Sequence, residues 1–160
     1  MSETQTLITI YTLMILETFN LILPNLILSF TNINAIFAIY NYYYCQKYIQ
    51  MLSITSIMII SIFYHLIEHH KHNMPGIGIL NSKFYHNIFL NLDRLFSVIA
   101  IITCYDPIIF SLDYILFIII ALISMFIAEN IAKTVPVYVL THSIWHLSVF
   151  EIARWLSLNC

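Results

Sequence analysis

Charged residues are scarce in this sequence, and they form no run of one sign. Only 9% of the 160 residues are Asp, Glu, Lys or Arg, against about 25% in an average soluble domain. The formal net charge is −2, and without a basic run the sequence predicts no nucleic-acid partner. The scarcity of charge also excludes an ordinary soluble domain.

Cysteine is rare as well. The three cysteines are Cys45, Cys104 and Cys160. Their odd number, their wide spacing and the lack of a Cys-x-x-Cys motif argue against a disulfide framework.

In place of charge the chain has long apolar runs. It is 61% hydrophobic, with a mean hydropathy of +0.87. A membrane-spanning helix needs about 20 mainly apolar residues, so the length allows at most about six spans and no soluble domain beside them. We therefore expect an all-α, polytopic transmembrane helix bundle of about five to six spans. Residues 1–160 would form a single, multi-pass integral-membrane domain.

The N-terminal third of the chain allows two interpretations. An apolar run from Thr6 to about Leu23 predicts an uncleaved span, because no positive residue precedes it and no small-residue cleavage site follows. Pro24-Asn25 predicts a kink or a hairpin. The next run, Leu26 to about Tyr40, is short. Either it is a second span, or residues 6–40 make one span plus an interfacial segment.

Four further apolar runs predict four more spans. Polar loops at residues 68–76, 106–107 and 129–136 separate these runs. The predicted spans are Met51 to about Leu66 with a start near Tyr48, Phe84 to about Tyr105, Ile108 to Ala128, and Val137 to about Leu158.

Polar side chains inside these runs mark candidate functional positions, because such side chains are costly in a bilayer. Ser61 and His65 are four residues apart, as are His142 and His146, so each pair shares one face of its helix. Asp93 lies about two turns into the following span. With one span between the Asp93 helix and the last helix, all five side chains fall within about 15 Å of the same membrane surface. We expect them to converge.

Three histidines in this arrangement predict a metal site. A lone histidine in a membrane helix is more often a packed residue, but three neutral imidazoles with one open position are typical of catalytic zinc. His65, His142 and His146 are therefore the predicted ligands of Zn²⁺. Asp93 is the candidate that orients a ligand imidazole or takes the proton of a water. Ser61 is the candidate donor to a developing oxyanion.

Neighbouring residues have simpler interpretations. Tyr64 and Trp145 are interpreted as aromatic residues of the membrane interface. Glu151 and Arg154 are three residues apart on one helix, and we expect them to pair. Glu17 has no partner that the pattern identifies.

The polar positions also form a known pattern: Ser61-x-x-x-His65, Asp93 early in the next span, and His142-x-x-x-His146 in the last span. This pattern resembles the signature of the CREST superfamily, which includes the alkaline ceramidases, the progestin and adipoQ receptors, and the myomaker and transmembrane protein 8 group. The resemblance covers about residues 20–155. The local sequence looks most like the last group at Leu23-Pro24-Asn25-Leu26, Tyr64-His65 followed by Met74-Pro75-Gly76, Leu92-Asp93, and His142-Ser143-Ile144-Trp145-His146.

The resemblance implies that the three histidines hold zinc and that Asp93 and Ser61 complete the site. It also implies a membrane lipid as substrate, since active members hydrolyse lipid amides or acyl esters. The family usually has seven spans, whereas residues 107–136 fit only one of the three that precede the last span. The substrate cavity would then be narrower, or shared with a partner chain in a homo-oligomer. The chain also lacks the acidic, Trp-containing N-terminal stretch of true ceramidases.

Other functions use the same residues differently. Some family members are receptors or act in membrane remodelling and fusion, so the main alternative is a non-enzymatic protein with a structural zinc. A closed four-ligand shell would favour that alternative, and an open position facing a cavity would favour a hydrolase.

Three weaker alternatives rest on the histidines. His65-Leu66-Ile67-Glu68-His69-His70 fits the histidine boxes of di-iron desaturases and hydroxylases, which use about eight histidines; this chain has seven, and His86 stands apart. His65-x-x-Glu68-His69 matches an inverted zinc-protease motif. Paired histidines on two helices also suit a haem. The loop histidines His69, His70 and His72 are most simply solvated.

Overall fold

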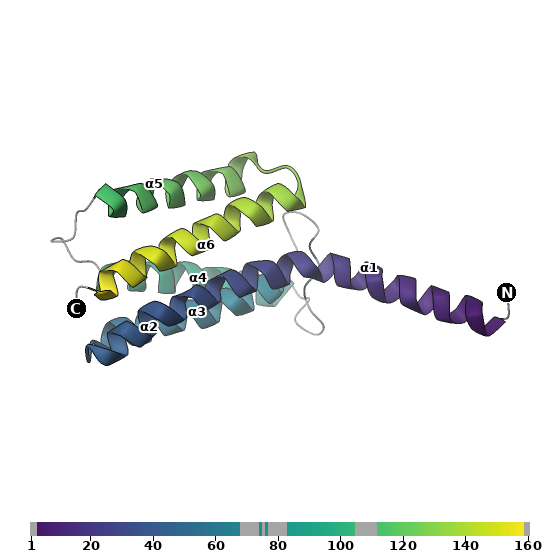
Figure 1. Ribbon diagram of the computed structural model, residues 1–160, viewed down its shortest axis with the longest axis horizontal. Coiled ribbons are helices and arrows are strands. Elements are labelled where there is room, and N and C mark those ends of the chain that lie inside the picture. The colour runs from purple at the N-terminus through teal and green to yellow at the C-terminus, as the bar shows by residue number, and fades with distance from the viewer. Residues whose placement is uncertain (1–2, 68–73, 75, 77–82, 105–111, 159–160) are drawn as a thin grey trace.

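A computed structural model describes residues 3–67, 74, 76, 83–104 and 112–158 of the chain. Within these ranges every regular element is helical, which confirms the predicted all-α bundle (Figure 1). The elements are α1 (Glu3–Thr31), η1 (Asn32–Asn34), α2 (Ala35–Tyr44), α3 (Tyr48–Ile67), α4 (Lys83–Cys104), α5 (Leu112–Phe126), η3 (Ile127–Ile131) and α6 (Val135–Leu158).

The N-terminal helix continues through Pro24. Pro24 lies inside α1, where it removes one backbone hydrogen bond without ending the helix. The short 3₁₀ turn η1 then leads into α2, which runs on in nearly the same direction (Figure 1). The predicted hairpin at Pro24-Asn25 is therefore wrong. Asn20–Tyr44 forms one segment that can cross a membrane, and the start of α1 projects beyond the other helices (Figure 1).

The next two helices match their predicted spans. α3 begins at Tyr48 and ends at Ile67, and α4 ends at Cys104. Both are runs of about 20 residues in which apolar side chains dominate, and this length is that of a spanning helix.

The end of α5 and the start of α6 differ from the prediction. α5 passes into a π-helical turn, η3, so Glu129 and Asn130 belong to a helical segment and not to a loop. Pro136 lies in the first turn of α6. A proline is tolerated there because its missing N–H would have no partner within the helix.

The helices pack in pairs around two apolar clusters. α3 packs against α4 and α5 packs against α6, while α1 and α2 lie along both α3 and α6. The larger cluster joins α2, α3, α4 and α6, and it includes Tyr42, Ile54 and Phe150. The smaller cluster contains Leu28, Met74, Ala128, Tyr138 and Val139. It holds α1, η3 and the start of α6 together.

Four segments are long and apolar enough to cross a membrane: Asn20–Tyr44, Tyr48–Ile67, Phe84–Cys104 and Tyr114–Ile131. Large apolar side chains cover their outer faces, among them Phe30, Ile101 and Leu122. Exposed apolar surface on this scale is not found on soluble monomers. The structure therefore indicates a membrane protein, as the composition predicts.

One predicted ion pair forms on α6. Arg154 Nε donates a hydrogen bond of 2.8 Å to a carboxylate oxygen of Glu151, and the two residues are three apart on the helix. Pairing neutralises both charges on a helix whose surroundings are largely apolar.

Two of the cysteines differ in their oxidation state. Cys45, at the end of α2, is disulfide-bonded, whereas Cys104 is a buried free thiol. The prediction against disulfides is thus wrong for Cys45, because separation along the sequence does not measure distance in a bundle.

Candidate metal centre

Three histidines from two helices converge inside the bundle. His65 lies near the end of α3, and His142 and His146 lie one turn apart on α6. They are 1%, 4% and 1% exposed. One nitrogen from each ring lies within 4.8 Å of the others, so the group is close enough to hold a metal ion. The predicted convergence of the three histidines is confirmed.

The rings have the spacing of metal ligands. Nε2 of His65 lies 3.2 Å from Nε2 of His146. Two nitrogens bound at about 2.05 Å to a tetrahedral ion are separated by about 3.3 Å. The three ring planes also meet at steep angles of 77°, 66° and 87°. The rings therefore approach one point from different directions.

His146 is anchored by a residue of α1. Its Nδ1 lies 2.8 Å from Oγ1 of Thr31, and the Thr31 hydroxyl donates its hydrogen to the carbonyl of Leu28 at 2.7 Å. A hydroxyl has one hydrogen to give, so Thr31 accepts from His146 and Nδ1 carries the proton. The lone pair on Nε2 of His146 is then free for a metal ion.

Asn32 lies beside the same imidazole. Its Nδ2 donates to the Leu28 carbonyl at 2.9 Å and lies 3.4 Å from Nδ1 of His146. The amide oxygen of Asn32 is buried and has no hydrogen-bond partner among the residues that the structure describes. An acceptor is thus left available next to a metal ligand. Sequence reasoning missed Thr31 and Asn32; their signal was two adjacent polar residues inside an apolar run.

Tyr64 is buried in the bundle, and its ring does not face the surrounding lipid. Its ring packs against His65 at 5.0 Å and against His86 at 5.6 Å between centroids. His86 is buried on α4, but the group that can hold a metal consists of the other three histidines. The interpretation of Tyr64 as an exposed aromatic residue of the membrane interface is wrong, because the side chain is buried.

Trp145 also contacts the metal centre. Its ring lies 5.3 Å from that of His142 and 5.0 Å from that of His146. The ring of Tyr138 lies 5.1 Å from that of His142. Trp145 therefore forms part of the wall around the histidines, and its interpretation as an interface aromatic stays a prediction.

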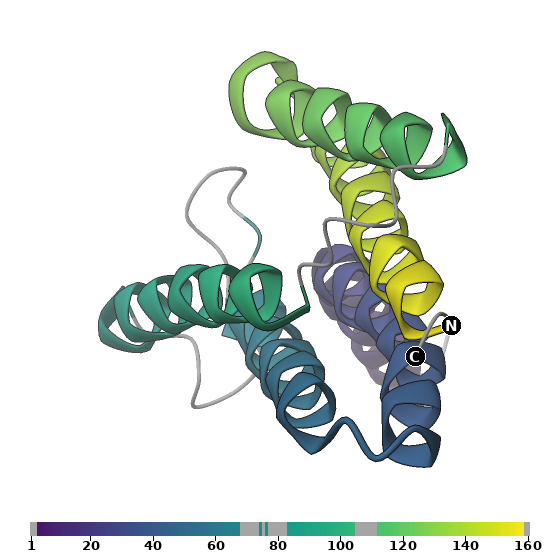
Figure 2. The same ribbon diagram turned by 90° about the vertical axis from the view of Figure 1, so that its left-hand side faces the viewer.

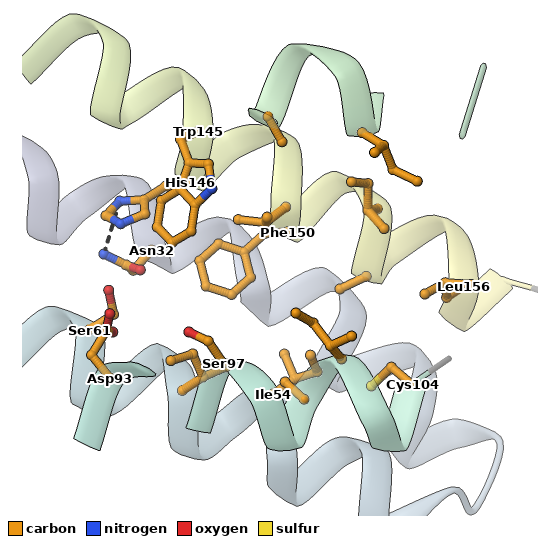
Figure 3. A pocket seen from close by; sticks show the side chains of 18 of the residues that line it. Asn32, Ile54, Ser61, Asp93, Ser97, Cys104, Trp145, His146, Phe150 and Leu156 are labelled. Atoms are coloured by element: carbon orange, nitrogen blue, oxygen red, sulfur yellow. Dashed lines mark hydrogen bonds between the residues drawn. The ribbon is translucent and has the colours of Figure 1, made fainter. Parts of the chain in front are cut away.

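A cavity of about 420 Å³ begins at His146 (Figure 3). Its polar end is formed by Asn32, Ser61, Asp93 and His146, and its apolar end by Cys104 and Leu156. Between the two ends, mainly apolar side chains of α3, α4, α5 and α6 form the walls: Ile54, Ile57, Ser97, Ala100, Ile101, Tyr114, Ile118, Ala121, Leu122, Val149, Phe150, Ile152 and Ala153.

The two predicted catalytic residues lie at the polar end. Ser61 is buried on α3, one turn before His65, and Asp93 is partly buried on α4. Figure 3 shows their side chains together, facing Asn32 and the imidazole of His146. The structure thus brings Ser61 and Asp93 to the same cavity as His146, and their catalytic roles stay predictions.

Three residues used by the alternative functions, and the loop histidine His72, lie outside the described part of the chain. The three are Glu68, His69 and His70. The histidine-box and inverted-protease interpretations depend on them and stay untested.

Comparison with known proteins finds one viral relative. The chain is 29% identical over 159 residues to "Uncharacterized protein L282" of Acanthamoeba polyphaga mimivirus, and the match covers 86% of this chain and 98% of the relative. No protein-family model matches, and no solved structure does. The similarity extends over nearly the whole viral protein, and its name carries no activity.

Proposed function

We propose that this protein is a multi-pass membrane enzyme of the CREST type, a zinc-dependent hydrolase that acts on a lipid amide or acyl ester. One observation carries the proposal. Three buried histidines at ligand spacing adjoin the polar end of an apolar cavity, where Ser61 and Asp93 also lie.

The multi-pass arrangement includes α6 as a further span. α6 buries polar side chains such as His142, Ser143 and Ser148 inside the bundle. Its exposed residues include the apolar Leu140 and Leu147. A helix that faces lipid has this pattern, with its polar side chains turned into the bundle and its apolar side chains turned outwards. With the four apolar segments, α6 supports five crossings.

His65, His142 and His146 would hold the zinc ion through ring nitrogens. Three protein ligands plus one open position distinguish catalytic zinc from structural zinc, in which a fourth protein ligand closes the shell. The cavity beside His146 leaves space next to the ligands, and this favours the hydrolase over the structural site. When bound, zinc supplies an acidified water and polarises a carbonyl.

Asp93 and Ser61 would provide the proton transfer and the hydrogen bond that hydrolysis also needs. Asp93 would accept the proton of the attacking water as a general base. Ser61 would donate its hydroxyl hydrogen to the carbonyl oxygen, on which negative charge develops. Burial strengthens both interactions because little water competes for them.

The shape of the cavity supports a lipid substrate. Its volume of about 420 Å³ lies within the range of about 300–1,000 Å³ for small-molecule sites. Apart from the polar end, the lining is mainly apolar. A scissile amide or ester would lie at the polar end, with its acyl chain directed along the apolar walls.

Metal analysis of the detergent-purified protein tests the proposal first. We expect about one zinc ion per chain, lost in His65→Ala, His142→Ala and His146→Ala. His86→Ala is the matched control, because His86 is a buried histidine outside the group. Absence of metal would overturn the proposal, and about two iron ions per chain would support a di-iron oxidase instead.

Turnover is tested next, by release of fatty acid from a panel of lipid amides and acyl esters. One zinc ion per chain with no hydrolysis of any lipid would favour a receptor or membrane-remodelling protein with a structural zinc. Hydrolysis that disappears with the three histidine substitutions would support the enzyme.

A further inference from the structure

The side-chain amide of Asn32 has a fixed orientation. Asn32 lies in η1, between α1 and α2, and it is 0% exposed. Its Nδ2 donates a hydrogen bond of 2.9 Å to the carbonyl of Leu28. A carbonyl oxygen can only accept, so the amide presents its nitrogen to Leu28 and its oxygen, Oδ1, elsewhere. Asn32 therefore holds an acceptor in a defined place.

This acceptor lacks a donor. Oδ1 of Asn32 is buried, and no hydrogen bond reaches it from the residues that the structure describes. Buried polar atoms are nearly always paired, because an atom that loses water without gaining a partner raises the free energy of the folded state. We therefore expect the donor on a molecule that enters the bundle.

Asn32 lies where such a molecule would react. It lines the polar end of the cavity together with Ser61, Asp93 and His146. Figure 3 shows its side chain between the imidazole of His146 and the side chains of Ser61 and Asp93. In the proposed reaction Ser61 donates to the carbonyl oxygen of the substrate, and Asp93 accepts a proton from the water. Asn32 is a further acceptor beside them, and it needs a donor close to the scissile carbonyl.

Amides and esters differ at the atom that follows this carbonyl. A secondary amide has an N–H there, whereas an ester has an oxygen with lone pairs and no hydrogen. The N–H would satisfy Oδ1 of Asn32, but the ester oxygen would leave it unpaired. A site with a buried hydrogen-bonding group discriminates strongly against an analogue that lacks the matching group.

We propose that Asn32 is a specificity-determining residue. Its amide oxygen accepts a hydrogen bond from the N–H of the scissile bond, so the site takes N-acyl lipids in preference to O-acyl esters. This role rests on the proposed hydrolysis at the same site, and it decides which of the two substrate classes reacts. Asn32 contacts the substrate through this hydrogen bond and takes no part in making or breaking a covalent bond.

A matched pair of lipids tests this role. N-palmitoyl ethanolamine and ethylene glycol monopalmitate have the same acyl chain and the same hydroxyethyl group, and they differ only by N–H against O. Esters are intrinsically more reactive, so the quantity to compare between proteins is the ratio of kcat/KM for the amide to kcat/KM for the ester. Asn32→Leu removes the acceptor and keeps a side chain of similar size. We expect it to lower this ratio by about 10- to 100-fold.

Asn34 provides the matched control. It lies in the same 3₁₀ turn but outside the described lining of the cavity. Asn34→Leu should therefore leave the ratio unchanged. An equal fall in Asn34→Leu and Asn32→Leu would trace the effect to the fold of the turn, and it would overturn the role of Asn32.

Thermal unfolding gives a second measurement that needs no turnover. A ligand that binds the folded chain raises the midpoint of unfolding, and the rise is larger for the tighter ligand at equal concentration. With chelator present, N-palmitoyl ethanolamine should raise the midpoint of the natural chain more than ethylene glycol monopalmitate does. Asn32→Leu should remove the difference. The natural chain alone supplies the first comparison, so it holds even where Asn32→Leu does not fold.

The two proposals can fail separately. Hydrolysis of both lipids with an unchanged ratio in Asn32→Leu would overturn the role of Asn32 and leave the hydrolase standing. Turnover of neither lipid would count against the hydrolase, and the thermal shifts would then decide the role of Asn32. A larger shift with the amide would support that role, and equal shifts with the two lipids would overturn it.

Discussion

Thr31 accepts a hydrogen bond of 2.8 Å from His146, across 115 positions of sequence. The contact joins the end of α1 to the middle of α6. It fixes the proton of His146 on Nδ1 and turns Nε2 towards the other histidines. The hydroxyl of Thr31, which is not one of the candidate metal ligands, thus sets the tautomer in which His146 could bind a metal ion.

Removal of this hydroxyl should weaken metal binding. We expect Thr31→Val to raise the dissociation constant for zinc by about 10- to 100-fold, as is typical for loss of a group that orients a ligand. Competition with a chromogenic chelator measures the constant. Thr31→Ser keeps the hydroxyl and should bind zinc like the natural chain. An unchanged affinity in Thr31→Val would show that His146 needs no such support.

Removal of the metal should lower thermal stability. A ligand that binds only the folded state stabilises it by about 4 kcal/mol at 1,000 times its dissociation constant. We therefore expect a chelator to lower the midpoint of thermal unfolding of the natural chain in detergent. His146→Ala, which lacks one ligand, should show no further decrease with chelator. Equal decreases in both proteins would contradict a metal site at these histidines.

Asp93 should affect turnover and not metal binding. If it is the general base, Asp93→Asn should lower kcat by about 10²- to 10⁴-fold with zinc content unchanged. Ser97→Ala is the matched control, because Ser97 lies one turn further along α4 and lines the same cavity. A loss of zinc in Asp93→Asn would instead assign Asp93 to the ligand shell. Retained turnover would remove its catalytic role.

The apolar end of the cavity should limit the length of the acyl chain. Leu156 is buried there, so Leu156→Trp should shift the preferred substrate to shorter chains, by about two to four carbons for a side chain of this size. Rates over a series of saturated acyl chains measure the shift. Leu158→Trp, at an exposed position on the same helix, should leave the preference unchanged. A shift of equal size in both variants would argue against an end wall at Leu156.

The sequence predicted the helix bounds and the histidine positions, because these depend on hydrophobicity and on the helical period. The bounds of α3 and the end of α4 follow from the lengths of their apolar runs. Inside a membrane, an apolar run of this length forms a helix because a helix pairs all of its backbone hydrogen-bonding groups internally. His65, His142 and His146 could be identified because ionisable residues in such runs are costly. Their convergence followed from the number of crossings.

Residue type and local sequence gave wrong or missing predictions where contacts between helices determine the position of a residue. Pro24-Asn25 predicted a kink or a hairpin, and the hairpin does not form because the loss of one hydrogen bond did not end α1. Tyr64 is of a residue type common at membrane interfaces, but its ring is buried and packs on His65. The role of Thr31 depends on which helix lies beside α6, and no spacing within α1 contains that information.

The placement of the metal ligands separates two parts of the bundle. The three histidines lie on α3 and α6, and Thr31 adds α1 to them, so a bound metal ion would hold these three helices together. α4 and α5 line the cavity and supply no histidine of the metal-binding group. The cavity walls thus include two helices, α4 and α5, that carry none of these three histidines, whereas α3 and α6 contribute to both the cavity and the histidine group. In the end-on view of Figure 2, α4 and α5 are the outer helices of the pairs that they form with α3 and α6. A change in the position of α4 or α5 would alter the shape of the cavity and leave the spacing of the three imidazoles unchanged.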